Sequence, residues 1–245
     1  ILVTGSNTTE QHPLVARYIM RAKEKGARLI VVDSRAIPLT RFADHHLRQR
    51  PGTDVAWING FMNVILNEGL ADQEFIKERT EGFEGLAKTI EKYTPEYVEK
   101  ITGIPKDDLI NATRTYARAE RASIVYSMGI TQHTTGVDNV VSCANLAMLT
   151  GNVGKQSTGV NPLRGQVNVQ GACDVGALPN VYSGYQSVTD ENIRAKFEKA
   201  WNTKLPAKPG LTVVEMTNEA AKGNIKVMYI MGENPMLSDP DISHV

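Results

Sequence analysis

The sequence contains little cysteine, no excess of charge of either sign and no long apolar run. Its two cysteines, Cys143 and Cys173, are too few for a disulfide framework and lack the spacing of a metal site. The 27 basic and 27 acidic residues cancel, so nothing favours nucleic acid or an anionic membrane as a partner. No apolar stretch approaches the roughly 18 residues that indicate a membrane-spanning helix. Both cysteines are expected to pack as small apolar side chains.

Both ends of the sequence are abrupt. Residues 1–4 read as the interior of a strand, with no methionine or signal peptide before them, and SDPDISHV stops as a helix begins. We therefore expect a fragment of a longer protein. Its 245 residues suffice for one large domain or two ordinary ones. Any targeting segment would have been cut away with the missing N-terminus, and the location that we expect is cytoplasmic.

The first 33 residues predict a strand–helix–strand unit. ILVTGSN is a short apolar strand that runs into a glycine turn, and the following helix begins at His12-Pro13 and ends at Gly26. ARLIVVDSR then reads as an apolar strand of the kind that is buried on both faces of a parallel sheet. Such a unit is expected to have a right-handed crossover.

Strands and helices alternate through the rest of the chain. Further apolar strands are predicted at 122–129 and 224–235. Helical patterns lie near 54–69, 72–79, 82–92, 95–101, 105–119, 136–152, 189–201 and 212–222. This alternation favours an α/β fold with a mainly parallel sheet flanked by helices, similar to doubly wound dinucleotide-binding domains.

Two strand-to-turn units resemble each other. ILVTGSN at 1–7 and VMYIMGEN at 227–234 each end an apolar strand in Gly-x-Asn. Their wide separation suggests two related α/β lobes. A chance match is an equal alternative, because a strand followed by glycine is common.

The strand ends indicate a nucleotide site. A glycine at the carboxyl end of a parallel strand, as at Gly5, lets the backbone approach a ligand, and a following helix offers free N–H groups to phosphate. Asp33 closes the second strand, where nucleotide-binding proteins place a carboxylate on a ribose or base. The full G-x-G-x-x-G pattern is absent, which ranks an ordinary NAD dehydrogenase last. A tight turn with a helix cap is the alternative explanation for Gly5 and Asn7.

Residues 162–179, PLRGQVNVQGACDVGALP, show neither helical nor strand periodicity. Their apolar side chains are poor composition for disorder, and long ordered irregular segments are commonly functional. Arg164 is the single basic residue of this segment. We therefore predict an ordered binding loop that offers one guanidinium.

Five stretches in order carry a resemblance to the large subunit of molybdenum or tungsten formate dehydrogenases, of the bis-molybdopterin guanine dinucleotide family. They are GSNTTEQHP, VVDSR, SMGITQ with LAMLTGNVGK, NPLRGQVNVQGACDVGALP and YIMGENP. Together they span essentially the whole chain, and the fourth is the most specific. Related nitrate reductases have a similar Gly-Gln loop, but the arginine of RGQ resembles the formate dehydrogenase version.

The resemblance implies two lobes that each hold one guanine dinucleotide arm of a bis-pterin cofactor with Mo or W. The first lobe would be residues 1–166, and residues 167–245 would be part of the second. A 4Fe-4S cluster and the cysteine or selenocysteine that ligates the metal would precede this chain, and a cofactor-capping domain would follow it. Formate and electron-transfer subunits or domains with iron–sulfur clusters would be the partners.

The same resemblance implies roles for individual residues. Arg164 would hold formate, because a guanidinium offers a carboxylate two parallel charge-assisted hydrogen bonds, and Gln166 would line the same pocket. The cofactor-binding turns would contain Gly5, Asn7, Glu10, His12, Asp33, Arg35, Gly52, Asp54, Met128, Gly129, Gln132, Gly232, Glu233 and Asn234. His12 could instead begin a helix, Gly52 and Asp54 could form an ordinary N-cap, and the neighbouring His133 could be purely structural. No metal ligand is predicted in this chain.

The expected reaction is oxidation of formate to carbon dioxide, with two electrons passing to the metal–pterin centre and then to iron–sulfur clusters. One alternative is another bis-pterin oxidoreductase, such as a nitrate reductase. The other is a cofactor-binding module without activity of its own, and the isolated fragment is expected to be inactive.

Overall fold

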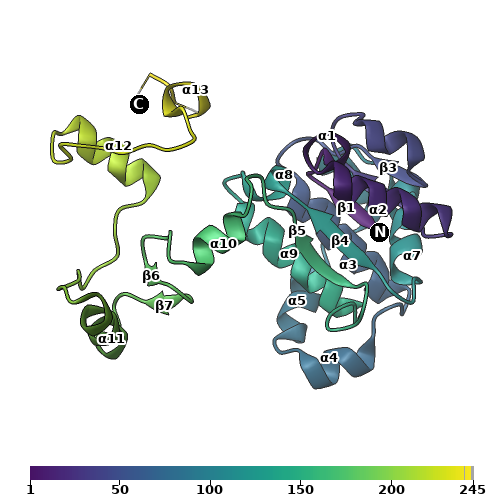
Figure 1. Cartoon of the computed structure of the whole chain (residues 1–245). Helices are drawn as coiled ribbons and strands as arrows, with labels where there is room; N and C mark the ends of the chain where they lie inside the picture. Colours follow the sequence, from purple (N-terminus) through teal and green to yellow (C-terminus); the bar gives the residue numbers. More distant parts are fainter. Residues whose placement is uncertain (240, 244–245) are drawn as a thin grey trace. The chain divides into compact units, whose positions relative to one another are not determined.

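The computed structural model describes residues 1–239 and 241–243. The chain forms two compact units, Ile1–Gly165 and Gln166–Val245, drawn in purple to teal and in green to yellow in Figure 1. The division falls beside residue 166. Whether each unit holds one cofactor arm stays a prediction.

The first unit contains a five-stranded parallel sheet in the order β3-β2-β1-β4-β5. Its strands are β1 Leu2–Thr4, β2 Ile30–Val32, β3 His45–Leu47, β4 Ser123–Tyr126 and β5 Gly159–Pro162. The chain runs outward from β1 through β2 to β3 and then returns to β4 on the other side of β1. The predicted α/β class with a parallel sheet is confirmed, and the sheet is doubly wound.

Helices enclose the sheet on both faces (Figure 1). They are α1 Thr8–Gln11, α2 Pro13–Glu24, η1 Pro38–Phe42, α3 Asp54–Asn67, α4 Gln73–Arg79, α5 Phe83–Ile90, α6 Pro95–Thr102, α7 Lys106–Ala117, α8 Met128–Thr131 and α9 Gly136–Leu149. Alternate residues of β1 enter two separate cores: Leu2 packs with α3, α7 and α9, and Val3 packs with Ile19 of α2. Burial on both faces explains why the strands read as continuous apolar runs.

Helix α3 is the centre of the larger core. Trp57 and Phe61 are fully buried and meet edge to face, with ring centroids 5.2 Å apart. Gly60 lets α6 approach, because a Cβ built on it would lie 2.8 Å from Cγ2 of Val98. This packing fixes the first residue of α3, Asp54, relative to the sheet.

The second unit differs from its prediction. Its described residues form a two-stranded antiparallel sheet, β6 Val181–Tyr182 with β7 Gln186–Ser187, and Tyr182, Phe197 and Trp201 form a small aromatic cluster. Its helices are α10 Val169–Asp174, α11 Glu191–Trp201, α12 Val213–Ala221 and α13 Pro235–Ser238. Helix α10 lies inside the segment that periodicity left irregular.

The strand predicted at 224–235 is wrong for this structure. The apolar run 227–231 has no strand assignment and pairs with no strand among the described residues, and Tyr229 is 88% exposed. A strand needs a hydrogen-bonded neighbour as well as apolar side chains. The second-lobe sheet therefore does not form from these described residues alone.

Gly5 and Gly129 bring the ends of β1 and β4 into backbone contact. The N–H of Gly129 donates to the carbonyl of Gly5 at 3.0 Å. A Cβ built on Gly5 would lie 2.6 Å from the carbonyl carbon of Gly129, and Gly5 has φ +56°. Both the close approach and the left-handed backbone therefore require glycine at position 5.

We expect Gly5→Ala to destabilise the protein far more than Gly26→Ala. Both glycines have positive φ, but a Cβ on Gly26 would meet nothing within 4 Å. Gly26→Ala is the control and should lose only about 1–2 kcal/mol of stability, the cost of a left-handed backbone for alanine. Gly5→Ala should lose more, because its Cβ also clashes with the backbone of Gly129. Thermal unfolding of the two purified variants measures the difference. Equal losses of stability would show that the approach of Gly129 is unimportant.

Candidate functional site

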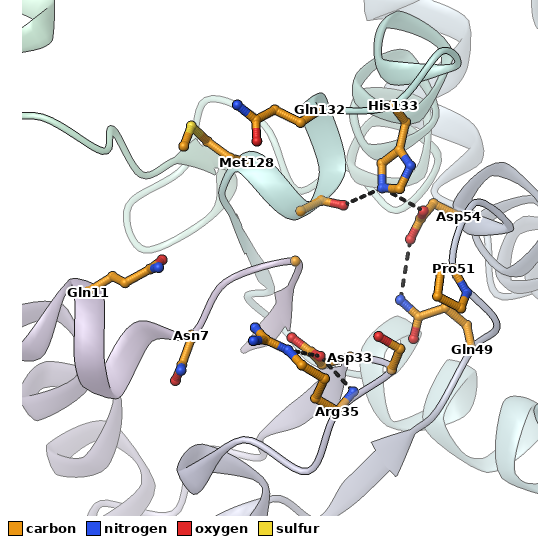
Figure 2. A pocket seen from close by; sticks show the side chains of 13 residues that line it. Asn7, Gln11, Asp33, Arg35, Gln49, Pro51, Asp54, Met128, Gln132 and His133 are labelled. Atoms are coloured by element: carbon orange, nitrogen blue, oxygen red, sulfur yellow. Dashed lines mark hydrogen bonds and ion pairs between the residues drawn. The ribbon is translucent and has the colours of Figure 1, made fainter. Parts of the chain in front are cut away.

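A cavity of about 380 Å³ opens at the carboxyl ends of β1, β2, β3 and β4 (Figure 2). It lies between β1 and β4, where the direction of the sheet order reverses, which is where open α/β sheets bind ligands. It is lined by Gly5, Asn7, Gln11, Asp33, Ser34, Arg35, Gln49, Pro51, Asp54, Met128, Gly129, Gln132 and His133.

Asp33 forms one wall of this cavity, at the end of β2. Its side chain is largely buried, and Oδ1 accepts a hydrogen bond from the backbone N–H of Arg35 at 2.8 Å. The Arg35 guanidinium lies 3.7 Å from the same oxygen and is mostly exposed. The turn after β2 therefore presents a carboxylate and a cation side by side.

Asp54 and His133 form the opposite wall. His133 Nε2 donates to the carbonyl of Gly129 at 2.9 Å and lies 3.8 Å from Oδ2 of Asp54, as Figure 2 shows. Oδ1 of Asp54 accepts from Gln49 Nε2 at 3.3 Å and from Trp57 Nε1 at 3.4 Å. A single buried carboxylate thus joins α3, the α8–α9 turn and the β3–α3 turn.

Gln49 leaves one hydrogen-bond acceptor unused. It is 9% exposed, and its Oε1 is buried without a partner among the described residues. Because the amide nitrogen of Gln49 donates to Asp54, Oε1 is the atom left to accept from a ligand. An unpaired buried acceptor costs about 1–3 kcal/mol. A ligand with N–H or O–H donors would remove this cost.

Arg164 lies just beyond β5 in the same unit. Its side chain is exposed, and its carbonyl accepts from His12 Nε2 at 2.6 Å. A Cβ built on Gly165 would lie 3.7 Å from Cε of Met128, which lines the cavity. Burial raises the pKa of Tyr126, and the positive charge of Arg164 opposes that shift. The guanidinium is therefore near the end of β4.

Comparison of the sequence with known protein families identifies the family of this chain. A family model described as molybdopterin oxidoreductase matches residues 1–245. The chain belongs to the molybdopterin oxidoreductase family. This confirms the family predicted from the five sequence stretches, and a molybdopterin cofactor follows from it.

Several relatives of this molybdopterin oxidoreductase chain are formate dehydrogenases. It is 59% identical over 245 residues to the F420-dependent formate dehydrogenase subunit alpha of Methanocaldococcus jannaschii, a match covering 100% of this chain and 36% of that protein. It is 48% identical over 246 residues to formate dehydrogenase H of Escherichia coli, covering 100% of this chain and 34% of that protein. The chain thus spans about a third of the length of these relatives.

A solved structure shares the fold of this family member. Acetylene hydratase from Pelobacter acetylenicus matches with a TM-score of 0.60 and 28% sequence identity, over 64% of this chain and 22% of that one. The likeness supports the doubly wound α/β architecture.

The cavity gathers much of the predicted cofactor site. Its lining includes the predicted residues Gly5, Asn7, Asp33, Arg35, Asp54, Met128, Gly129 and Gln132. Glu10, His12 and Gly52 lie in the same unit but do not line it. Thr53 is the N-cap of α3 and Asp54 its first residue, which leaves the Asp54 carboxylate facing the cavity.

Five lining residues were absent from the prediction: Gln11, Ser34, Gln49, Pro51 and His133. Gln11 and Ser34 lie inside the stretches that carried the resemblance, so the motif itself held their signal. Gln49 and Pro51 follow β3, a short His-His-Leu strand that no apolar pattern predicts. His133 contacts Gly129 and approaches Asp54, in addition to any structural role.

The two Gly-x-Asn turns have matching backbones. Gly5 and Gly232 both have positive φ, at 56° and 74°. Asn7 and Asn234 each cap a four-residue helix, α1 and α13, and their carbonyls accept its first hydrogen bonds. Residues 232–234 are exposed and lie in the second unit. The short helix α1 that follows Gly5 was not predicted, whereas the helix predicted from His12-Pro13 to Gly26 is confirmed as α2.

Other features of the described residues are plain. No helix within 1–239 or 241–243 has the length and apolar character to cross a bilayer, and the described part holds no cluster of three or more potential metal ligands. Cys143 is fully buried, and burial raises its pKa to about 12. This confirms its predicted packing as an apolar side chain.

We expect Asp54→Asn to stabilise the cofactor-free protein at neutral pH. Burial raises the pKa of Asp54, although hydrogen bonds from Trp57 and Gln49 and the charge of His133 lower it. The ionised group therefore costs folding free energy at pH 7, and the cost vanishes below the unfolded pKa of about 3.9. The Tm difference between variant and parent should shrink as the pH falls towards that value.

The control is Asp138→Asn at an exposed position, which should change Tm little at both pH 4 and pH 7. A Tm advantage of Asp54→Asn that is the same at pH 4 and pH 7 would contradict the charge-burial explanation.

Proposed function

We propose that the whole protein is a molybdopterin-dependent formate dehydrogenase alpha subunit, and that this chain is the central part of its cofactor and substrate site. The observation that carries the proposal is the cavity at the β1–β4 switch point, with buried Asp33, Asp54 and Gln49 inside it and Arg164 beside it. The relatives named above are formate dehydrogenase subunits, which favours formate over other substrates of the family.

The cavity residues fit a guanine nucleotide arm of the cofactor. Guanine and ribose carry N–H and O–H donors, and the cavity offers acceptors: the carboxylates of Asp33 and Asp54 and the unpaired Oε1 of Gln49. The glycine at position 5 keeps side-chain atoms away from the backbone turn where the nucleotide would approach. The exposed guanidinium of Arg35 suits a phosphate.

A second nucleotide arm would use the second Gly-x-Asn turn. The matching conformation of Gly232 and Asn234 supports this assignment, because one backbone arrangement would present the same groups twice. Glu233 accepts a hydrogen bond from Ser238 Oγ at 3.2 Å, which stabilises this turn. Residues 167–245 would then be part of the second lobe.

Arg164 would bind formate. A guanidinium holds a carboxylate through two parallel charge-assisted hydrogen bonds, and Gln166, exposed at the start of the second unit, would line the same pocket. The reaction converts HCOO⁻ to CO₂, one proton and two electrons. The bound metal–pterin group supplies the redox chemistry. This chain's residues bind and orient formate and the nucleotide arms.

The remaining parts of the proposal rest on the resemblance and the relatives. They are the bis-guanine-dinucleotide form of the cofactor, Mo or W as its metal, a 4Fe-4S cluster, iron–sulfur partner subunits and a cytoplasmic location. Nitrate is the rival substrate, since a guanidinium also binds that trigonal anion. A cofactor-binding role without turnover is the rival for the chain by itself.

We expect Asp33→Ala in the whole protein to lower guanine nucleotide and metal content while unfolding stays cooperative, because a carboxylate at a turn contributes little packing. Asp108→Ala, at an exposed position in the first turn of α7, is the control and should load normally. Nucleotide released by acid hydrolysis and metal per protein are the measurements. Unchanged content in Asp33→Ala would remove Asp33 from the cofactor site.

We expect Arg164→Lys to lower kcat/KM for formate about ten- to a hundred-fold. The substitution keeps the charge but loses the bidentate fork, and a hydrogen bond to a charged group contributes roughly 1.5–3 kcal/mol. Cofactor loading should stay near the parental value, because other turns hold the arms. Formate-dependent dye reduction per bound metal measures the effect.

The control is Arg121→Lys, at an exposed position before β4, which should behave as the parent. Parental efficiency in Arg164→Lys would exclude Arg164 as the formate anchor. A parent that reduces nitrate and does not oxidise formate would replace the proposed function with the rival one.

A further inference from the structure

The carbonyl of Arg164 is held by a residue 152 positions earlier in the chain. His12 Nε2 lies 2.6 Å from this oxygen. A carbonyl only accepts hydrogen bonds, so Nε2 carries the proton and donates it. His12 does not line the cavity, and its predicted contact with the cofactor stays a prediction.

The side chain of His12 does not serve as a cap of helix α2. His12 occupies the position between α1 and α2, but its side chain makes no capping hydrogen bond to α2. Its Nδ1 is buried without a partner among the described residues. The bond to Arg164 is therefore the hydrogen bond that the imidazole makes, at the cost of one unpaired acceptor.

Two further bonds hold the residues just before Arg164. The N–H of Leu163 donates to the carbonyl of Tyr126 at 2.7 Å, and Ser127 Oγ donates to the carbonyl of Leu163 at 3.0 Å. The main chain is thus tied to the end of β4 up to Leu163. His12 extends this anchoring by one residue, from a different element.

We propose that His12 is a positioning residue that holds the main chain of Arg164 so that its guanidinium meets the substrate carboxylate with both N–H groups. This inference rests on the proposed function. Bidentate recognition depends on the fixed geometry of the fork, and where that fork lies relative to the substrate depends on where the main chain at Arg164 is held.

The kinetic test uses three substitutions in the whole, cofactor-loaded protein. His12→Ala removes the donor, His12→Gln places an amide N–H near the position of Nε2, and His12→Asn favours the start of α2 but is too short to reach Arg164. We expect KM for formate to rise about ten-fold in the Ala and Asn variants, with kcat changing less than about three-fold and metal content unchanged. The Gln variant should recover most of the parental KM.

Amide hydrogen exchange of a peptide covering residues 163–168 gives a readout that does not need formate. Exchange should be several-fold faster in the Ala and Asn variants than in the parent and in the Gln variant, because the Leu163 N–H loses a neighbouring anchor. Unchanged exchange in the Ala variant would overturn the inference, whatever the substrate is.

The two readouts separate this inference from the proposed function. Faster exchange in a protein without formate activity would keep His12 as the anchor of Arg164 and remove the proposed substrate. Faster exchange with an unchanged KM for formate, in a protein where Arg164→Lys lowers kcat/KM, would overturn the link between His12 and substrate binding.

Discussion

The backbone contact between Gly5 and Gly129 is the constraint on which the site depends. It joins the ends of two adjacent parallel strands whose following segments diverge, because β1 leads towards β2 and β4 leads towards β5. Side chains at either position would force the strand ends apart. With glycine at both, the turns after β1 and β4 close into one wall, and the remaining strand ends surround the cavity.

This cavity holds polar groups that are costly without a ligand. Asp54 is 3% exposed and burial raises its pKa, and Gln49 has an acceptor without a partner among the described residues. A core built only for stability would pair or replace such groups. Under the proposed function, the N–H and O–H donors of a nucleotide would pair with these groups at the sheet switch point. We propose the molybdopterin cofactor of this family as the ligand that pairs with them.

The surroundings of Arg164 differ from those of the cavity. Arg164 is exposed and follows the edge strand β5. The main chain of Leu163 forms hydrogen bonds with Tyr126 and Ser127, and the carbonyl of Arg164 accepts one from His12. The proposed cofactor groups lie on buried strand ends, whereas the arginine proposed to bind substrate lies on a loop whose main chain is anchored. Because the two sets of residues lie on different elements, the loop that carries Arg164 can change without loss of the cavity.

The sequence alone determined the strand–turn positions of the first unit. Apolar runs ending in Gly5 and Asp33 identified β1 and β2, and adjacent carboxyl ends of parallel strands then placed both residues in one site. The family also followed from local stretches, confirmed over the whole chain. These features are readable because each depends on a few consecutive residues.

Tertiary structure decided what depends on distant partners. The polar strand β3 forms because β2 lies beside it, and it carries Gln49 into the cavity. The apolar run 227–231 has no such neighbour among the described residues and makes no strand. The contact of His12 with Arg164 joins residues 152 positions apart. The hydrophobic pattern of a sequence predicts which side chains are buried. It does not predict hydrogen-bond pairing or close backbone contacts between distant residues, because these form only in the folded chain.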